Sequence, residues 1–172
     1  SGLLRPSSGV AKVCGRDVAE EPLEVRARFG YLPEESVLYE ELTAREHLDL
    51  FADLRGVSRA EAKARAGRLL EFLDLAHAAD RPVGSYSRGM RRKASIAVTL
   101  IGDPEAVLFD EPTGGLDPDG AHRFAELLGE LRRRQKTVVI QSHILGLVEK
   151  RCDRIGILDH GKLLACGTLE EL

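Results

Sequence analysis

The chain has 172 residues, of which 43% are hydrophobic, and this suits one globular domain with a sizeable core. Its 25 basic and 28 acidic residues give a formal net charge of −3, which provides no long-range attraction toward nucleic acid or anionic lipid. No apolar run approaches the roughly 20 residues that cross a bilayer, and no signal-peptide pattern opens the chain, so we expect a soluble cytoplasmic protein. Cys14, Cys152 and Cys166 are widely spaced, and we expect them to be reduced, buried and not bound to metal.

The first forty residues contain two strand-like runs, at residues 10–14 and 29–32, separated by Pro, Gly and charged residues. The opening residues Ser1 to Pro6 include no initiator Met and are typical of a helix end that runs into a proline turn. We therefore expect further sequence to precede Ser1 in the intact protein.

The pattern then changes to that of helices. Thr43 and Ser58 are each followed three residues later by a glutamate, which is the capping-box arrangement of a helix start. A third helix is predicted to begin near Ser87 and to end at Ile101, before a Gly-Asp-Pro turn. Together these segments predict a mostly helical insert over residues 43–102.

Beyond Pro104, strand-like runs alternate with helical patterns, as in parallel α/β sheets. We therefore predict a single α/β domain over residues 1–172, with a core formed by residues 1–42 and 103–172. The predicted elements are strands at 106–109, 137–141 and 154–158 and helices at 119–134 and 145–151.

Two adjacent carboxylates, Asp110 and Glu111, end the strand at 106–109 and precede Pro112. Open parallel sheets bind their ligands at the carboxyl ends of the strands, so these acids stand where chemistry is expected. One carboxylate suits Mg²⁺, which prefers oxygen ligands, and the next can orient and deprotonate an attacking water. Taken alone, the pair fits equally well with two acids that cap a strand before a turn.

Three further sequence patterns stand at positions that suggest a functional role. Residues 114–118, Gly-Gly-Leu-Asp-Pro, follow the acids directly, and His143 comes shortly after the strand at 137–141. Upstream, Ser87 and Gly89 stand at a predicted helix start, where exposed amides bind anions. Each pattern alone is weak, because a Ser-x-Gly helix start is usually a cap and a lone His after a strand is usually structural.

In this order the patterns resemble one family, the ATP-binding-cassette (ABC) ATPases, over essentially the whole chain. Residues 86–90, Tyr-Ser-Arg-Gly-Met, resemble the signature motif, residues 107–110 resemble Walker B, and residues 115–117 resemble the D-loop. Residues 30–35, Gly-Tyr-Leu-Pro-Glu-Glu, resemble the Q-loop, and the sequence from there to Thr43 is similar to that of exporter-type members. The ordered combination is far more specific than any one of its parts.

The resemblance implies both a fold and a site. The fold would be the P-loop NTPase-like α/β core of ABC ATPases with a helical subdomain, and two such subunits would enclose ATP and Mg²⁺ between them. Glu111 would be the catalytic glutamate, and His143 would contact the γ-phosphate. Asp110 and Glu34 would organise Mg²⁺. The residues implied to bind the nucleotide are Ser87, Arg88, Gly89, Glu34 and Asp117.

Three positions depart from the commonest family pattern. Glu34 and Met90 stand where most members have Gln, and Gly114 stands where Ser is frequent. Glu34 can still coordinate Mg²⁺ or a water, although it adds negative charge beside phosphates. Related subunits tolerate such changes, so the departures do not predict an inactive protein.

The phosphate-binding loop, G-x-x-x-x-G-K-[ST], has no match in the sequence. Residues 156–162 come nearest, but Leu163 follows the lysine where a Ser or Thr must ligate Mg²⁺. The last four of them, residues 159–162, lie between two strand-like runs at 154–158 and 163–166, so we predict a hairpin turn at residues 159–162. In the family the loop precedes the region that resembles residues 1–9, so we expect the 172-residue chain to lack the loop and the strand before it. A protein that never had the loop is the alternative.

The sequence thus predicts an ATP-hydrolysing subunit of an exporter-like ABC transporter, and the 172-residue chain alone would be inactive. Expected partners are a second ABC ATPase subunit, in a homo- or heterodimer, and transmembrane permease subunits that hold the protein at the inner face of the membrane. No nucleic acid partner is expected. The alternatives are a non-hydrolytic remnant or regulatory module that dimerises with a complete subunit, and a soluble family member that acts on ribosomes or DNA.

Overall fold

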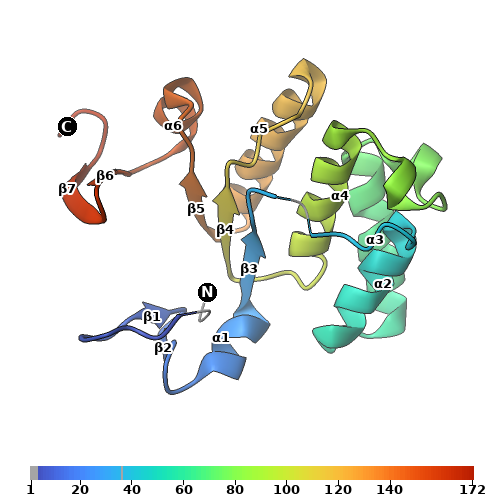
Figure 1. Ribbon diagram of the computed structural model, residues 1–172, viewed down its shortest axis with the longest axis horizontal. Coiled ribbons are helices and arrows are strands. Elements are labelled where there is room, and N and C mark those ends of the chain that lie inside the picture. The colour runs from blue at the N-terminus through green and yellow to red at the C-terminus, as the bar shows by residue number, and fades with distance from the viewer. Residues whose placement is uncertain (1–3, 36) are drawn as a thin grey trace. The chain divides into compact units, whose positions relative to one another are not determined.

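The computed structural model describes residues 4–35 and 37–172, and the chain divides into two compact units, Ser1–Gln141 and Ser142–Leu172 (Figure 1). The first unit opens with β1 (Lys12–Val13), β2 (Arg16–Asp17), α1 (Pro22–Arg28) and β3 (Phe29–Leu32). A helical segment follows, with α2 (Ala44–Leu54), α3 (Arg59–Phe72), the 3₁₀ turns η1 (Ala76–Ala78) and η2 (Val83–Ser85), and α4 (Arg88–Leu100). The unit ends with β4 (Ala106–Asp110), α5 (Pro118–Arg133) and β5 (Thr137–Gln141). The second unit contains α6 (Leu145–Arg151), β6 (Ile155–Asp159) and β7 (Lys162–Gly167).

The strands β3, β4 and β5 form a parallel sheet with β4 in the centre. Ala106 pairs with Phe29 on one side and with Thr137 on the other, so the three strands begin at the same edge. Val107 and Phe109 of β4 are fully buried, as expected for the central strand of a parallel sheet. Consequently, the segments that leave the carboxyl ends of β3 and β4 start side by side.

Helices α4 and α5 pack against this sheet. Phe109 of β4 meets Phe124 of α5 edge to face, with ring centroids 5.2 Å apart. A Cβ at Gly30 of β3 would lie 3.0 Å from the carbonyl oxygen of Thr99, so the glycine allows α4 to approach β3 closely. Helix α4 also contacts α2 and α3, and it therefore joins the helical segment to the sheet (Figure 1).

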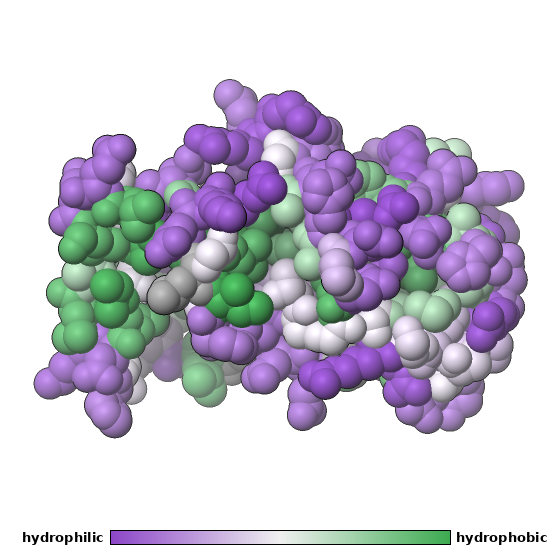
Figure 2. All heavy atoms as spheres, turned by 90° about the horizontal axis from the view of Figure 1, so that it is seen from above, coloured by the Kyte–Doolittle hydropathy of each residue, from purple (hydrophilic) through white to green (hydrophobic). Residues whose placement is uncertain are grey.

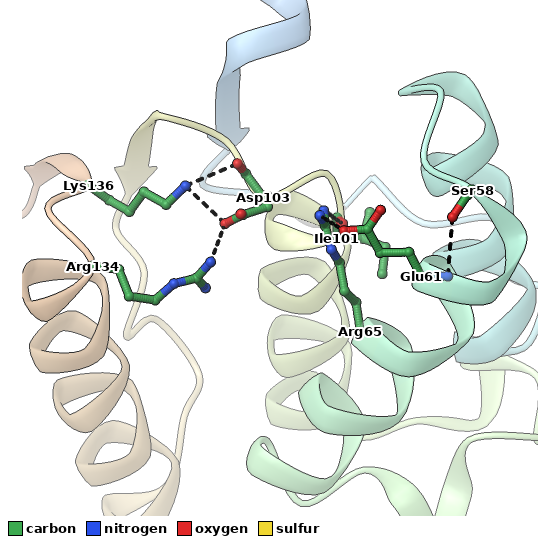
Figure 3. Close-up of polar contacts among 7 residues, drawn as sticks. All are labelled: Ser58, Glu61, Arg65, Ile101, Asp103, Arg134 and Lys136. Carbon is green, nitrogen blue, oxygen red and sulfur yellow. Dashed lines mark hydrogen bonds and ion pairs between the residues drawn. The ribbon is translucent and has the colours of Figure 1, made fainter.

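Of the two predicted capping boxes, one forms completely and the other only in half. Thr43 accepts a hydrogen bond from the N–H of Glu46, and the Glu46 carboxylate accepts from the N–H of Thr43 at 2.8 Å. That backbone hydrogen bond lowers the pKa of Glu46. Ser58 accepts from the N–H of Glu61 at 3.4 Å, but the Glu61 carboxylate pairs with Arg65 (Figure 3). The second box is therefore a wrong prediction, because an ion pair within α3 competes for its glutamate.

The end of α4 is fixed to its neighbours by polar contacts (Figure 3). Arg65 of α3 donates a hydrogen bond to the carbonyl of Ile101 at 3.1 Å. Asp103, in the turn after α4, forms ion pairs with Arg134 at 2.8 Å and with Lys136 at 3.0 Å. This turn therefore links the helical segment to the end of α5.

The second unit is built on a hairpin. β6 and β7 pair antiparallel, and Asp159 opposite Lys162 closes a two-residue loop. The loop residues His160 and Gly161 both have positive φ, 43° and 77°, as a type I′ turn requires. The hairpin turn predicted at residues 159–162 is thus confirmed. Hydrophobic side chains gather on the surface of this unit, at the left of Figure 2, and the exposed ones include Leu158, Leu163 and Leu164.

Most other predicted elements are confirmed, and β3, β5 and α6 have the predicted bounds. The run at 10–14 contributes only β1, because Cys14 and Gly15 have positive φ and turn the chain into β2. The sequence patterns did not predict α1, which begins with Pro22 at a favourable first position. The three cysteines are free, but the expected burial is wrong: Cys166 is exposed, and Cys14 and Cys152 are half-buried. Within the described residues, no helix is both long and apolar enough to cross a membrane.

Candidate functional site

Two acidic segments meet at the carboxyl edge of the sheet. Asp110 is the last residue of β4 and Glu111 follows it, both half-buried, whereas Glu34 lies two residues after β3 and is exposed. Because Leu32 and Phe109 are register partners, the segment that carries Glu34 continues beside the segment that carries the two other acids. The structure therefore brings three of the predicted site residues into one region.

Glu111 has a left-handed backbone, with φ of 43°. Its N–H donates to the carbonyl of Gln141 at 2.9 Å, and its own carbonyl accepts from the N–H of Gly114 at 3.1 Å. A left-handed conformation costs a non-glycine residue about 1–2 kcal/mol and persists only where the surroundings enforce it. Hydrogen bonds through its N–H and its carbonyl thus fix the backbone of Glu111, as is required of a residue whose side chain must keep a defined position.

Arg92 of α4 connects the two acidic segments and was not among the predicted site residues. Its side chain is 2% exposed, and it donates hydrogen bonds to the carbonyls of Pro33 at 2.6 Å and Glu34 at 2.9 Å. It also donates to the carbonyls of Asp110, Glu111 and Pro112. Burial lowers the pKa of Arg92, and the neighbouring carboxylates, that of Asp110 first, oppose this shift.

The sequence gives only a weak signal for Arg92, because two of its neighbours on the helix face, Ser95 and Thr99, are polar. At helical spacing it shares a face with Ser95, Ile96 and Thr99, and all four side chains are buried. A guanidinium on the buried face of a helix needs several acceptors, because leaving it unpaired is costly. That requirement points to an internal binding role for Arg92 rather than to a solvated basic run.

Asp110 provides an oxygen suited to a cation. Its Oδ1 is buried and has no hydrogen-bond partner in the part of the chain that the structure describes. A buried acceptor without a hydrogen bond is destabilising, and a bound cation or its water would satisfy this oxygen. Among the same described residues no three His, Cys, Asp or Glu side chains form a metal cluster. Mg²⁺ that is bound together with phosphates needs only one or two protein carboxylates, which Asp110 and Glu34 can supply.

The start of α4 presents hydrogen-bond donors. Ser87 caps the helix by accepting from the N–H of Met90 at 3.2 Å, so its own O–H is left to donate. The first-turn amides of Arg88 and Gly89 have no intrahelical acceptor, as at any helix start. Because Ser87 and Arg88 are exposed, these groups together form a surface that suits a phosphate.

The same helix start packs against the loop that follows the acids. A Cβ on Gly89 would lie 2.9 Å from the carbonyl oxygen of Gly115, a contact that leaves no room for a side chain. Gly115 has φ of 81°, and a Cβ there would meet the Arg88 side chain at 2.9 Å. Asp117 ends this loop and caps α5, because its carboxylate accepts from the N–H of Gly120 at 2.8 Å. The predicted residues from the signature motif and the D-loop thus lie in one contact region.

His143 belongs to the second unit, where it follows β5 closely in the chain and is exposed. The Oγ of its neighbour Ser142 accepts from the N–H of Ile144 at 3.1 Å, which orders the turn before α6. The role of His143 stays a prediction.

The chain resembles many known proteins along its whole length. The family model described as "ABC transporter" matches residues 1–114. NatA, an ABC transporter ATP-binding protein of Bacillus subtilis, is 42% identical over 173 residues, which cover 100% of this chain and 70% of NatA. The daunorubicin resistance ATP-binding protein DrrA3 of Streptomyces coeruleorubidus is 41% identical, and the match covers 100% of this chain and 54% of DrrA3.

A solved structure of the ATP-binding subunit of an ABC transporter superposes with a TM-score of 0.93. Its sequence is 36% identical, and the match covers 99% of this chain and 71% of that one. The superposition therefore compares nearly all of the present chain with part of a longer subunit.

Proposed function

Because the chain belongs to the ABC transporter ATP-binding family and has its α/β fold with a helical subdomain, we propose that it binds and hydrolyses ATP to energise a membrane partner. One observation carries the proposal. Arg92 holds the segments of Glu34, Asp110 and Glu111 together, and the start of the same helix packs against the loop that ends at Asp117. One chain thus carries acidic groups suited to a metal and a water, and also donors suited to a phosphate that a second subunit would present.

In this proposal, Glu111 accepts a proton from the attacking water, and the backbone contacts described above hold it in position. Asp110 and Glu34 hold Mg²⁺, which when bound would neutralise charge on the phosphoryl group in transfer. His143 donates a hydrogen bond to the γ-phosphate.

The start of α4 acts across a dimer in this proposal. The Ser87 hydroxyl and the first-turn amides of Arg88 and Gly89 bind the γ-phosphate of a nucleotide that the other subunit holds. Asp117 couples the two sites, because the loop it ends contacts Gly89 on one side and the turn of Glu111 on the other.

We further propose the organisation and partners that follow from this role. Residues 1–42 and 103–172 form the catalytic core, and residues 43–102 form the helical subdomain. A second ABC ATPase subunit completes the nucleotide sites, and transmembrane permease subunits bind near the exposed side chains of Val37 and Tyr39, which places the protein at the cytoplasmic face of a membrane. The net charge of −3 gives no support for a nucleic acid partner.

The 172-residue polypeptide contains no G-x-x-x-x-G-K-[ST] sequence. We therefore expect it to hydrolyse ATP negligibly on its own, because the loop's amides and lysine stabilise the β- and γ-phosphates. We expect it to serve a complete subunit in trans through the start of α4.

Complementation tests this function. A complete family subunit whose own signature serine is changed to alanine is mixed with the 172-residue chain, and phosphate release is measured. We expect the 172-residue chain to restore ATPase activity. The restored activity should disappear with Ser87→Ala and should persist with Glu126→Gln, a change on the exposed face of α5. A mixed dimer without restored activity would favour the non-hydrolytic module, and the absence of any mixed dimer would contradict the proposed assembly.

A further inference from the structure

Arg92 is a buried cation that binds carbonyl groups in place of a carboxylate. Its side chain is 2% exposed, and in the described part of the chain it forms no ion pair within salt-bridge distance. Five carbonyl oxygens accept from its guanidinium instead. A buried charge usually requires a paired countercharge, so an arrangement that uses only backbone acceptors calls for a specific explanation.

The acceptors come from two segments that are far apart in sequence. Pro33 and Glu34 follow β3, and the carbonyls of Asp110, Glu111 and Pro112 lie at the end of β4. A guanidinium has five donors in a rigid plane, so it can hold several carbonyls at fixed separations. Arg92 therefore ties the backbone of the segment after β3 to the backbone of the segment after β4.

The charge of Arg92 also acts on its surroundings. The carboxylates of Asp110, Glu34 and Glu111 are close enough to raise the pKa of Arg92 against the larger effect of burial. By the same interaction the guanidinium offsets part of the repulsion among these carboxylates. One side chain thus provides both the geometry and the electrostatic balance of the acidic region.

We propose that Arg92 is a positioning residue for hydrolysis, which sets the spacing between the Mg²⁺-binding carboxylates and the water-activating carboxylate. This role rests on the proposed function. Arg92 stands three residues, or about one helical turn, after Gly89 on α4. A displacement of the phosphate-binding start of α4 is therefore transmitted through Arg92 to Glu34, Asp110 and Glu111.

The test compares Arg92→Lys and Arg92→Gln with Arg91→Lys in the natural-length protein, purified with its partners. Arg91 is the matched control, because its guanidinium donates to the carbonyl of Gly84 and to the exposed Glu40, and neither residue belongs to the two segments that Arg92 connects. Displacing catalytic groups by about 1 Å costs about 100-fold in rate, so kcat should fall by that order in Arg92→Gln. The KM for ATP should stay within about threefold, and half-maximal activity should require more Mg²⁺.

Lysine should recover only part of the loss, because one ammonium group cannot reach carbonyls of both segments in the way a planar guanidinium does. Thermal unfolding of each variant separates this effect from a general loss of structure. Hydrogen exchange at residues 34–35 and at the non-proline residues of 110–114 measures the connection directly and needs no ATP. Both Arg92 variants should speed exchange in both segments, and Arg91→Lys should change neither.

Each outcome supports or overturns the positioning role of Arg92. Faster exchange with unchanged kcat would show that the connection exists but positions nothing for hydrolysis. Unchanged exchange would show that the connection is dispensable. An apparent kcat that falls only in proportion to the lost folded protein would show a merely structural role. Wild-type protein without Mg²⁺-dependent ATPase activity would overturn the proposed function itself, and the exchange measurement would still report on the connection.

Discussion

Tyr86 stands directly before the start of α4, and its burial gives it a pH dependence that can be measured. Its hydroxyl donates to the carbonyl of Ala78 at 2.6 Å, and burial raises its pKa above the value of about 10 of an exposed tyrosine. The folded state holds the proton more tightly, so this contribution to stability is complete below pH about 10 and is lost as the pH rises through the folded-state pKa.

The change that tests this is Tyr86→Phe. At neutral pH the variant should be less stable by about 1–2 kcal/mol, because the carbonyl of Ala78 loses its donor. Above pH about 10 the free energy of unfolding should fall more steeply in the wild type than in the variant. Urea unfolding across this pH range measures both effects, and parallel curves for the two proteins would contradict the assignment.

Glycines at two positions should respond to alanine in opposite directions. A Cβ on Gly89 would lie 2.9 Å from the carbonyl oxygen of Gly115, whereas a Cβ on Gly67 of α3 would meet nothing within 4 Å. Gly67→Ala should stabilise the fold by about 0.5–1 kcal/mol, because glycine weakens a helix interior. Gly89→Ala should destabilise it and separate the start of α4 from the loop at 114–116. Chemical unfolding ranks the two variants, and equal effects would rule out the close contact.

Among the elements, α2 and α3 allow a direct comparison of helix starts. Thr43 takes part in both hydrogen bonds of a capping box, whereas Ser58 makes one bond of 3.4 Å. Thr43→Ala should therefore cost about 1 kcal/mol or more of stability, and Ser58→Ala clearly less. Thermal unfolding of both variants measures the difference. A larger effect at Ser58 would mean that the ion pair of Glu61 with Arg65 depends on the cap.

Over the whole molecule, burial differs strongly between the two units. Val107 and Phe109 in the sheet are fully buried, whereas among the residues 142–172 whose burial is described only Gly167 is buried. A two-stranded hairpin alone is marginally stable, so amides of β6 and β7 should exchange with solvent much faster than those of β4 in the 172-residue chain. Hydrogen exchange followed by mass spectrometry tests this, and equal protection would show that the exposed leucines of the hairpin are covered in solution.

The sequence by itself determined the local elements and the family. Periodicity and capping residues predict β3, β5 and α6 with their observed bounds, because strands and helices impose periods of 2 and 3.6 on their side chains. Each motif between Glu34 and His143 is a short run of neighbouring residues, and the order of the motifs along the chain indicates the ABC family without a structure. The comparisons confirm the family. The roles of the individual site residues stay predictions.

The tertiary structure decided between competing partners of one side chain and showed which distant segments meet. The interaction of Glu61 with Arg65 in place of a capping box is a competition between two local partners, which spacing alone does not resolve. The contact of Gly89 with Gly115 and the five acceptors of Arg92 join segments that chain order leaves unrelated. A buried guanidinium must find its acceptors wherever packing places them, so only the folded chain shows that Arg92 holds the acidic segments together.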